Sequence, residues 1–222
     1  MPEPAESTAP TSHIEVAETH PDRWWSMPCL SGNLVRLRPL AIEDAQGLHS
    51  ALWADGAGDE VFRWLGRPAP RTEDQLRETI HAALAQRAHG ERLPYAQVDA
   101  RTGELIGTTS YYDVAPAART LAIGHTWLGR RWWRTGHNTE SKLLMLGHAF
   151  DGLGAVRVVW HTDMLNERSR SAISRLGARF EGELRKHRLR ADGSWRDSAQ
   201  FAMLDDDWPA NRERLTSALE RS

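Results

Sequence analysis

The stretch GRRWWRTGHN, residues 129–138, gathers positive charges, bulky rings and a lone glycine directly before a helix-like run. The first amide groups of a helix lack internal partners, and the helix dipole places roughly half a positive charge at that end. Such an end binds anions, phosphate above all. Arg130, Arg131 and Arg134 add full positive charges, and Gly136 lets a ligand approach the backbone closely. The stretch therefore predicts an anion site, with a surface loop of solvated arginines as the alternative.

The sequence lacks the two commonest nucleotide-binding motifs. A phosphate-binding loop ends in Gly-Lys-Ser/Thr, and no such string occurs. The dinucleotide fingerprint needs three spaced glycines, whereas TGHNTE has one. His137, His148 and His161 do not have the spacing typical of metal ligands, so we predict no metal site.

The composition is that of a globular domain. The chain has 222 residues, of which 40% are hydrophobic and 26% charged. Its formal net charge of −2 disfavours nucleic acid as a partner, and Cys29, the single cysteine, excludes an internal disulfide. The sequence contains neither an apolar run of the ~18 residues that a membrane helix needs nor a secretion signal. We therefore predict a cytoplasmic protein without a membrane partner.

The amino-terminal residues differ in character from the rest. Residues 1–22 are rich in Pro, Glu, Ala, Ser and Thr, which predicts a flexible tail before a single domain at 23–222. Trp24 and Trp25 end this composition abruptly. We expect them to dock on the domain surface, with partner binding as the alternative.

Hydrophobic periodicity predicts an alternation of strands and helices. Strands are expected at 34–40, 94–99, 105–114, 120–128, 156–162, 179–190 and 194–204. Helices are expected at 42–54, 73–87 with Thr72 as cap, 138–151, 169–175 and 206–220. This order predicts a mixed α/β domain with a central sheet of about seven strands flanked by helices.

Two stretches resemble the GNAT superfamily of acetyltransferases, especially its RimJ/RimL-like branch. IGHTWLGRRWWRTGHNTESKLLMLGHAF is similar to the family's Arg/Gln-x-x-Gly-x-Gly/Ala loop, whose amides hold the pyrophosphate of acetyl-coenzyme A. Arg131 fills the first position of this loop and Gly136 the last, whereas Arg134 stands where the family usually has glycine. TDMLNERSRSAISRLGARFEG is similar to the branch's Asn-x-x-Ser helix and the Leu-Gly turn after it.

The resemblance implies a fold and a mode of binding. The fourth and fifth predicted strands, 120–128 and 155–162, would splay apart and hold the pantetheine arm in the gap. The residues expected to bind acetyl-coenzyme A are Trp127, Leu128, Arg131, Arg134, Thr135, Gly136, His137, Asn138 and Asn166. Transfer would be direct, to an amine of a protein amino terminus or of a small molecule, in a monomer or homodimer.

The catalytic candidates are Ser169 and His125. Ser169 is the serine of the Asn-x-x-Ser motif and could protonate the leaving thiolate, although a hydroxyl in a first helical turn is often merely satisfied by a carbonyl. Asn166 also suits the helix cap. His125, beside the expected acetyl group, is a candidate base, with Asp113 and Tyr112 as weaker ones and simple packing as the alternative.

The acceptor side is less defined. Trp53, Phe62 and Trp64 could form an aromatic wall, although core packing is the commoner role of such residues. The run 185–190 is basic and could attract an acidic substrate or simply be a solvated strand face. A coenzyme A-binding regulator without catalysis, or an interaction module, remains the alternative to an enzyme because Arg134 departs from the motif.

Overall fold

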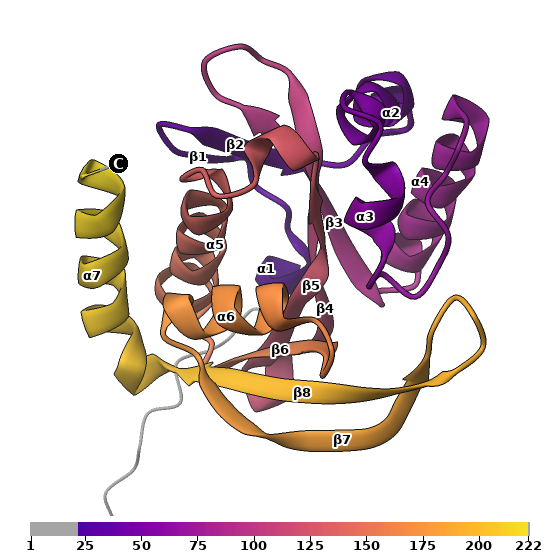
Figure 1. Cartoon of the computed structure of the whole chain (residues 1–222). Coiled ribbons are helices and arrows are strands. Elements are labelled where there is room, and N and C mark those ends of the chain that lie inside the picture. Colours follow the sequence, from indigo (N-terminus) through magenta and orange to yellow (C-terminus); the bar gives the residue numbers. More distant parts are fainter. Residues whose placement is uncertain (1–21, 222) are drawn as a thin grey trace, which may run out of the picture.

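The computed structural model describes residues 22–221, which form a central sheet between two layers of helices (Figure 1). Within these residues the sheet has eight strands in the order β1-β2-β3-β4-β5-β6-β8-β7. They are β1 (Leu30–Ser31), β2 (Val35–Pro39), β3 (Arg92–Asp99), β4 (Leu105–Ala115), β5 (Thr120–Leu128), β6 (Arg157–Asp163), β7 (Arg179–Leu189) and β8 (Trp195–Leu204). Neighbouring strands run antiparallel except for β5 and β6, which are parallel.

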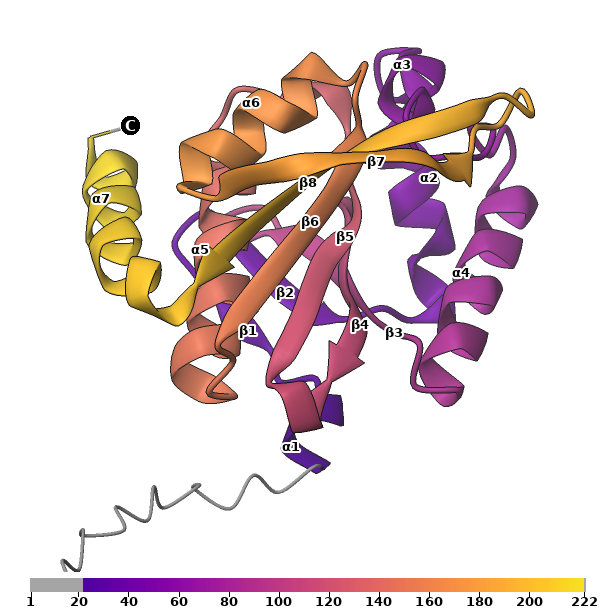
Figure 2. The ribbon, with the colours of Figure 1, turned by 90° about the horizontal axis from the view of Figure 1, so that it is seen from below.

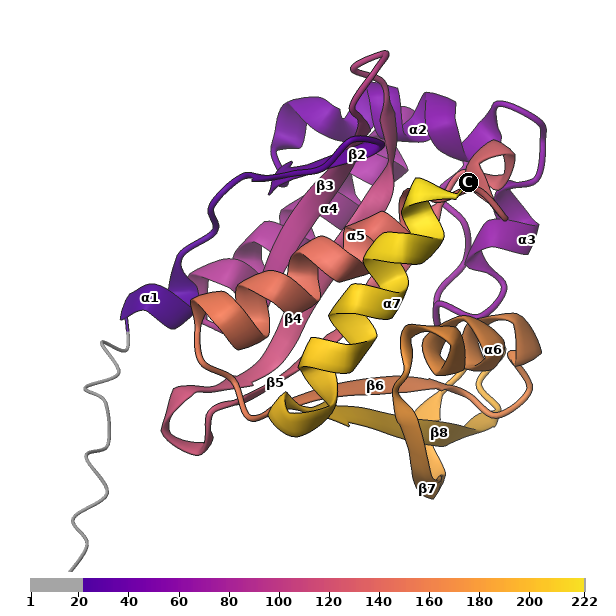
Figure 3. The same cartoon turned by 90° about the vertical axis from the view of Figure 1, so that its left-hand side faces the viewer.

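The helices cover the two faces of the sheet unequally. They are α1 (Asp22–Trp25), α2 (Ala45–Trp53), α3 (Gly58–Phe62), α4 (Glu73–Ala88), α5 (His137–Gly147), α6 (Glu167–Leu176) and α7 (Trp208–Glu220). Helices α5, α6 and α7 lie on one side, and α2, α3 and α4 lie on the other (Figures 1 and 3). A large apolar core fills the first side, and a smaller core lies under α2 and α4.

The seven expected strands and five expected helices are all present within a few residues of their predicted bounds. Caps account for several boundaries: Thr72 accepts the Gln75 amide at 3.2 Å, and Gly177 ends α6 with a left-handed φ of 99°. Sequence periodicity missed β1, α1 and α3, which are too short to show a period.

The region around the expected tail differs partly from the prediction. Residues 1–21 lie outside the described residues, whereas Asp22 begins α1. Trp24 is buried in the larger core rather than docked on the surface, whereas Trp25 is 37% exposed.

The predicted splay of the fourth and fifth strands is confirmed. These strands are β5 and β6 in the structure, because the short strand β1 was not predicted. Their pairing extends only from Thr120 to Ala122 on β5, opposite 157–159 on β6, whereas β6 pairs with β8 as far as Asp163 (Figure 2). An extra residue in β5 interrupts its pairing with β4, and His125 there has a φ of +50°. This bulge bends β5 away from β6.

One buried carboxylate fixes the start of α5. Glu140 is 6% exposed and accepts the amides of Asn33, Leu34 and Val35 at 2.9, 2.7 and 2.7 Å. These three bonds attach the first turn of α5 to the turn before β2, so the helix entrance is held rigidly.

Two further properties concern possible partners. No helix among residues 22–221 is long and apolar enough to span a membrane. Within the same residues, no group of His, Cys, Asp and Glu side chains is arranged to hold a metal ion.

Candidate active site

The entrance of α5 presents unpaired backbone donors. Strand β5 ends at Leu128, a short turn spans Arg130–Trp132, and α5 begins after Gly136 without a side-chain cap. The amides of residues 134–139 have no hydrogen-bond acceptor within the described part of the chain. Six such donors at the positive end of a helix suit a phosphate group. We call residues 129–139 the phosphate corner.

Two arginines of the phosphate corner already have acidic partners. Arg130 pairs with Glu60 at 3.3 Å, and Arg131 pairs with Glu104 at 2.9 Å. The Arg131 guanidinium also lies 4.0 Å from the centre of the Trp132 ring. Their side chains are therefore engaged with the protein, and the place of Arg131 in ligand binding stays a prediction.

Arg134 is exposed and forms no ion pair with any residue in 22–221. Its φ is +60°, the left-handed conformation that costs about 1–2 kcal/mol for a residue with a Cβ atom. A glycine would adopt this conformation freely. The backbone therefore gives a physical reason for the glycine of the family motif.

Gly136 has a different reason to be glycine. Its φ of −66° is ordinary, but a Cβ there would lie 2.5 Å from Leu34 Cδ1 and 3.3 Å from Leu219 Cδ2. Close packing of α5 thus requires a residue without a side chain at this position. A role of Gly136 in ligand approach stays a prediction.

Thr135 and His137 bind protein partners through their side chains. The Thr135 hydroxyl donates to the Trp132 carbonyl at 2.7 Å and lies 2.9 Å from His137 Nδ1, while His137 Nε2 lies 3.0 Å from Asp99 Oδ2. Burial opposes ionisation of Asp99, but hydrogen bonds from Thr102, His137 and a neighbouring amide outweigh it and lower its pKa to about 2. These two side chains are therefore engaged with protein groups, and a role of Thr135 and His137 in ligand binding stays a prediction.

Asn138 remains available. It is half-buried in the first turn of α5, and its side chain makes no hydrogen bond to another residue in the described range 22–221. Its amide group could therefore face a bound ligand directly.

The start of α6 forms the other side of the gap. Asn166 caps this helix as expected, because its Oδ1 accepts the Ser169 amide at 3.1 Å. Ser169 is half-buried, and its hydroxyl has no hydrogen-bond partner among residues 22–221. The Arg168 guanidinium lies 3.5 Å from the centre of the Trp133 ring, so α6 contacts the phosphate corner.

Trp127 and Leu128 form the edge of the gap on β5. The Trp127 ring is buried 5.6 Å from Phe62, and its carbonyl lies 3.3 Å from Gln97 Nε2. The Leu128 carbonyl accepts the Trp133 indole N–H at 2.9 Å. Both carbonyls therefore have protein donors, and a role of these two residues in ligand binding stays a prediction.

The aromatic wall expected beside the acceptor is mostly packing. Phe62 is buried in the smaller core, and Trp53 packs beside it and donates its indole N–H to the Pro70 carbonyl at 2.8 Å. Trp64 is half-buried, with Arg63 5.1 Å from its ring centre.

A chain of polar rings crosses the sheet on the side of α4. His125 meets Tyr112 edge-on at 5.3 Å, the Tyr112 hydroxyl lies 2.9 Å from His161 Nδ1, and His161 Nε2 lies 3.1 Å from Gln200 Oε1. Burial raises the pKa of Tyr112 to about 12 and lowers that of His161. The rings connect β5, β4, β6 and β8 and form a polar floor.

His125 lies among positive charges. Desolvation, followed by the charges of Arg92, Arg67 and Arg188, lowers the pKa of its ring to about 3. The residue is nevertheless exposed to the cleft, so water screens part of this effect. The direction means that His125 is neutral at pH 7.

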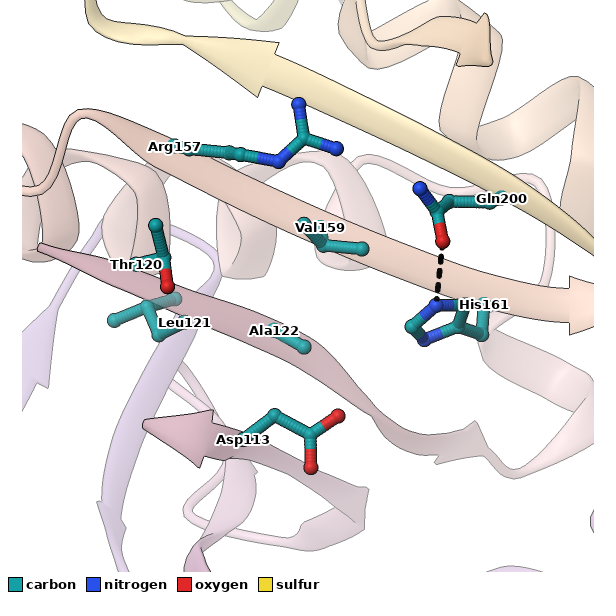
Figure 4. Close-up of a pocket in the computed structure, with 8 residues that line it drawn as sticks. All are labelled: Asp113, Thr120, Leu121, Ala122, Arg157, Val159, His161 and Gln200. Atoms are coloured by element: carbon teal, nitrogen blue, oxygen red, sulfur yellow. Dashed lines mark hydrogen bonds between the residues drawn. The ribbon is translucent and has the colours of Figure 1, made fainter. Parts of the chain in front are cut away.

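A hollow of about 280 Å³ lies beside this floor (Figure 4). Its lining residues are Asp113, Thr120, Leu121, Ala122, Arg157, Val159, His161 and Gln200. It opens over the paired halves of β5 and β6, and the dashed bond in Figure 4 joins His161 to Gln200. Arg157 is committed to Glu181 and both ring nitrogens of His161 have partners, so Asp113 is the charged group of this lining without a hydrogen-bond partner among residues 22–221.

Sequence reasoning missed several residues of the site. His161, Asp99 and Arg168 become relevant only when strand register places them beside Tyr112, His137 and Trp133. Alternation along β6 predicts that His161 lies on the same face of the strand as Val159. It does not predict which residue His161 contacts.

The fold and the site define a class: an α/β domain with a forked pair of parallel strands and an amide-lined helix entrance beside the fork. Residues 35–179 match the family described as Acetyltransferase (GNAT) domain, so the chain belongs to this family and is an acyltransferase. The resemblance seen in the sequence is thereby confirmed. No curated protein matches the chain.

Solved structures agree with this assignment. The chain is 29% identical to a GCN5-related N-acetyltransferase from Brucella melitensis, with a TM-score of 0.82 over 87% of this chain and 86% of that one. It is 35% identical to a putative acetyltransferase from T. thermophilus, with a TM-score of 0.77 over 88% and 99% of the two chains. Mycobacterium smegmatis RimJ, solved with CoA-disulfide, is 24% identical with a TM-score of 0.73 over 88% and 96%. This last likeness, at 24% identity, shows the fold alone.

Proposed function

We propose that the protein is an N-acetyltransferase that moves an acetyl group directly from acetyl-coenzyme A to a primary amine. The amine belongs to a protein amino terminus or to a small molecule. One observation carries this proposal: amides 134–139, which have no acceptor among residues 22–221, lie at the helix entrance that follows the splayed strand of a GNAT domain.

The chain has the groups needed to hold acetyl-coenzyme A. The amides of 134–139 would bind the pyrophosphate, with Arg134 and Asn138 contacting its oxygens. The pantetheine arm would lie between β5 and β6, against the backbone of Trp127 and Leu128 and the side chain of Asn166. The structure fits this substrate because these donors lack protein acceptors within residues 22–221.

The chemistry requires two proton transfers. The amine nitrogen attacks the thioester carbonyl carbon, the carbon–sulfur bond breaks, and the thiolate takes up a proton. Ser169 would pass this proton to the sulfur and take a replacement from solvent water, since its hydroxyl is not committed within the described residues. The amine loses a proton to His125, directly or through water. A base with a low pKa is weak, so the surroundings of His125 matter for the rate.

A single assay tests this function. The protein is mixed with acetyl-coenzyme A and a panel of amines while free thiol release is followed. Turnover with any amine supports the enzyme, whereas tight coenzyme A binding without turnover would replace it by a regulator. Absence of both would overturn the proposal.

Thermal shifts locate the cofactor. Coenzyme A should raise the melting temperature by mass action, and dephospho-coenzyme A should keep most of the shift because its pyrophosphate is intact. Pantetheine lacks the phosphates and should shift it far less. Equal shifts from coenzyme A and pantetheine would contradict binding at the phosphate corner.

A further inference from the structure

Four arginines converge on the α4 side of the sheet without an acidic partner. They are Arg67 in the loop between α3 and α4, Arg92 on β3, Arg188 on β7 and Arg196 on β8. None forms an ion pair with any of residues 22–221. We call them the arginine cleft.

Arg92 is the most deeply placed of the four. It is 5% exposed, its Nε donates to Ser110 Oγ at 2.8 Å, and its terminal nitrogen lies 3.5 Å from Gln86 Oε1. Both partners are neutral. A buried guanidinium without a counter-charge is costly unless a ligand supplies the negative charge.

Arg67 lies next to Arg92. Both side chains line one small cavity together with Trp127 and residues of α4. The Arg67 guanidinium also lies 5.7 Å from the centre of the Phe62 ring. This contact supplies no negative charge to balance the guanidinium. Burial lowers the pKa of both guanidinium groups, and the charge of Arg67 adds to the effect at Arg92.

The hairpin of β7 and β8 brings the other two arginines to the same place. It curves beneath α3 and α4 (Figures 1 and 2), and a Cβ on Gly66 would lie 3.6 Å from the Leu189 carbonyl. Arg67 directly follows Gly66 in the sequence, and Arg188 directly precedes Leu189. Segments more than a hundred residues apart therefore close one end of the cleft.

Arg188 and Arg196 face each other across the hairpin. They are register partners, and Arg196 Nε donates to Ser198 Oγ at 2.9 Å. Arg190, directly after the end of β7, is by contrast bound to Asp163 through two bonds of 2.6 and 3.1 Å. The carboxylate nearest the cleft is thus already used.

The acidic groups around the cleft do not balance it. Asp163 interacts with Arg196 but is held by Arg190, and Asp113 lies toward Tyr112 and His161. Four guanidinium groups therefore meet one uncommitted carboxylate. The positive charge surrounds His125, the candidate base at the bulge of β5.

We propose that the arginine cleft binds a carboxylate or phosphate group carried by the amine acceptor, so that the enzyme acts on anionic amines. The proposal rests on the proposed acetyltransferase function and specifies its acceptor. Coenzyme A would not supply this anion, because its pyrophosphate is assigned to the phosphate corner at the start of α5, a helix on the opposite side of the sheet from α4 (Figure 1). A bound anion would also offset the charges that hold the pKa of His125 low, which would make His125 a better base.

Matched acceptors test the proposal. O-phosphoethanolamine is compared with ethanolamine, and the peptide Ser-Glu-Ala-amide with Ser-Gln-Ala-amide, by thiol release from acetyl-coenzyme A. We expect the anionic member of at least one pair to have a kcat/KM about 10- to 100-fold higher, the range for a charge-assisted contact. The preference should shrink as salt rises. The pair that shows it tells whether the acceptor is small or a peptide.

Variants connect the preference to the cleft. Arg188→Gln and Arg67→Gln should each reduce the anionic-to-neutral ratio to less than about a third, through KM of the anionic acceptor. Arg185→Gln, on the same hairpin but outside the cleft, should leave the ratio unchanged. Arg92→Lys keeps the charge and guards against failure of a larger change to fold, and it should reduce the ratio because a point charge replaces a planar fork.

A binding measurement without turnover separates anion binding by the arginine cleft from the acetyltransferase activity. In saturating coenzyme A, which fills the phosphate corner, O-phosphoethanolamine should bind measurably tighter than ethanolamine by calorimetry. Loss of turnover with retained selective binding would sink the proposed function and leave the cleft assignment standing. Turnover without any anionic preference would overturn the assignment. A preference for succinyl-coenzyme A over acetyl-coenzyme A that Arg188→Gln abolishes would place the anion on the donor and also overturn it.

Discussion

The phosphate corner and the arginine cleft use the same kinds of residue in opposite ways. At the corner, Arg130, Arg131 and His137 each meet a carboxylate, and the groups left without a partner in residues 22–221 are backbone amides and the Arg134 side chain. In the cleft the free groups are side chains, because the guanidinium groups of Arg67 and Arg92 lack acidic partners within residues 22–221. A dense run of cations in sequence is therefore no guide to free positive charge in the fold.

The contrast follows from how each region is built. The corner is a single contiguous loop in which Glu60 and Glu104 pair with Arg130 and Arg131, whereas Arg134 forms no ion pair within residues 22–221. The cleft is assembled from four segments and partly removed from water, where an unpaired charge attracts an anion more strongly. The two regions suit two different anionic partners.

The largest expected effect lies where the two sides of the gap meet. Ser169→Ala should lower kcat by roughly 10- to 1,000-fold, because the thiolate would lose its general acid. Affinity for acetyl-coenzyme A should change little. Steady-state kinetics over a pH range, with Ser171→Ala on the exposed side of α6 as control, measures this. Preserved turnover at every pH would make Ser169 only a helix residue.

Features that depend on local sequence patterns could be predicted from the sequence. Strands such as β5 and helices such as α4 were predictable because their apolar positions repeat over eight or more residues, whereas β1 and α3 are too short. The corner was predictable as a contiguous motif, and Asn166 as a cap, because both depend on local spacing.

The cleft was not predictable in the same way. The sequence shows the basic run at 185–190. It does not show that Arg190 forms an ion pair with Asp163, or that Arg188 lies opposite Arg196. Arg67 and Arg92 stand alone in the sequence, and only the contact of the hairpin with the loop before α4 brings them beside it. Nor did the motif disclose that Arg131 would be held by Glu104.

A change of charge at the helix entrance should have the next largest effect. Asn138→Asp keeps the shape of the side chain and suits a first helical turn, so stability should be unchanged or slightly higher. The new carboxylate would repel the pyrophosphate, and coenzyme A should bind roughly 10- to 100-fold more weakly. Calorimetry measures the affinity, and Gln75→Glu, the same change in the first turn of α4, is the control. Undiminished affinity would remove phosphate from the corner.

Arg134 separates charge from backbone conformation. Arg134→Ala keeps the left-handed strain but loses the guanidinium, so acetyl-coenzyme A should bind about 1–2 kcal/mol more weakly, less so at high salt. Arg134→Gly should bind better than the alanine variant, and its free energy of unfolding should rise by about 1 kcal/mol as strain is relieved. Calorimetry and denaturant titration measure the two quantities. Unchanged or tighter binding in the alanine variant would mean that the corner depends on its amides alone.

The smallest effect tests whether the corner's arginines are held in reserve or merely structural. Glu104→Gln removes the partner of Arg131, and an exposed pair of this kind contributes about 0–1 kcal/mol, so stability should hardly change. The released guanidinium lies in the motif loop and would gain freedom to turn toward the pyrophosphate. Coenzyme A affinity should then rise about two- to threefold at low salt and return toward the original value at high salt. The same change in an Arg131→Gln background should give no gain, which a double-mutant cycle measures by calorimetry. A gain that persists without Arg131 would trace to the lost negative charge itself, and no gain in either background would leave Arg131 as framework, with Arg134 as the arginine of the corner that can meet the pyrophosphate.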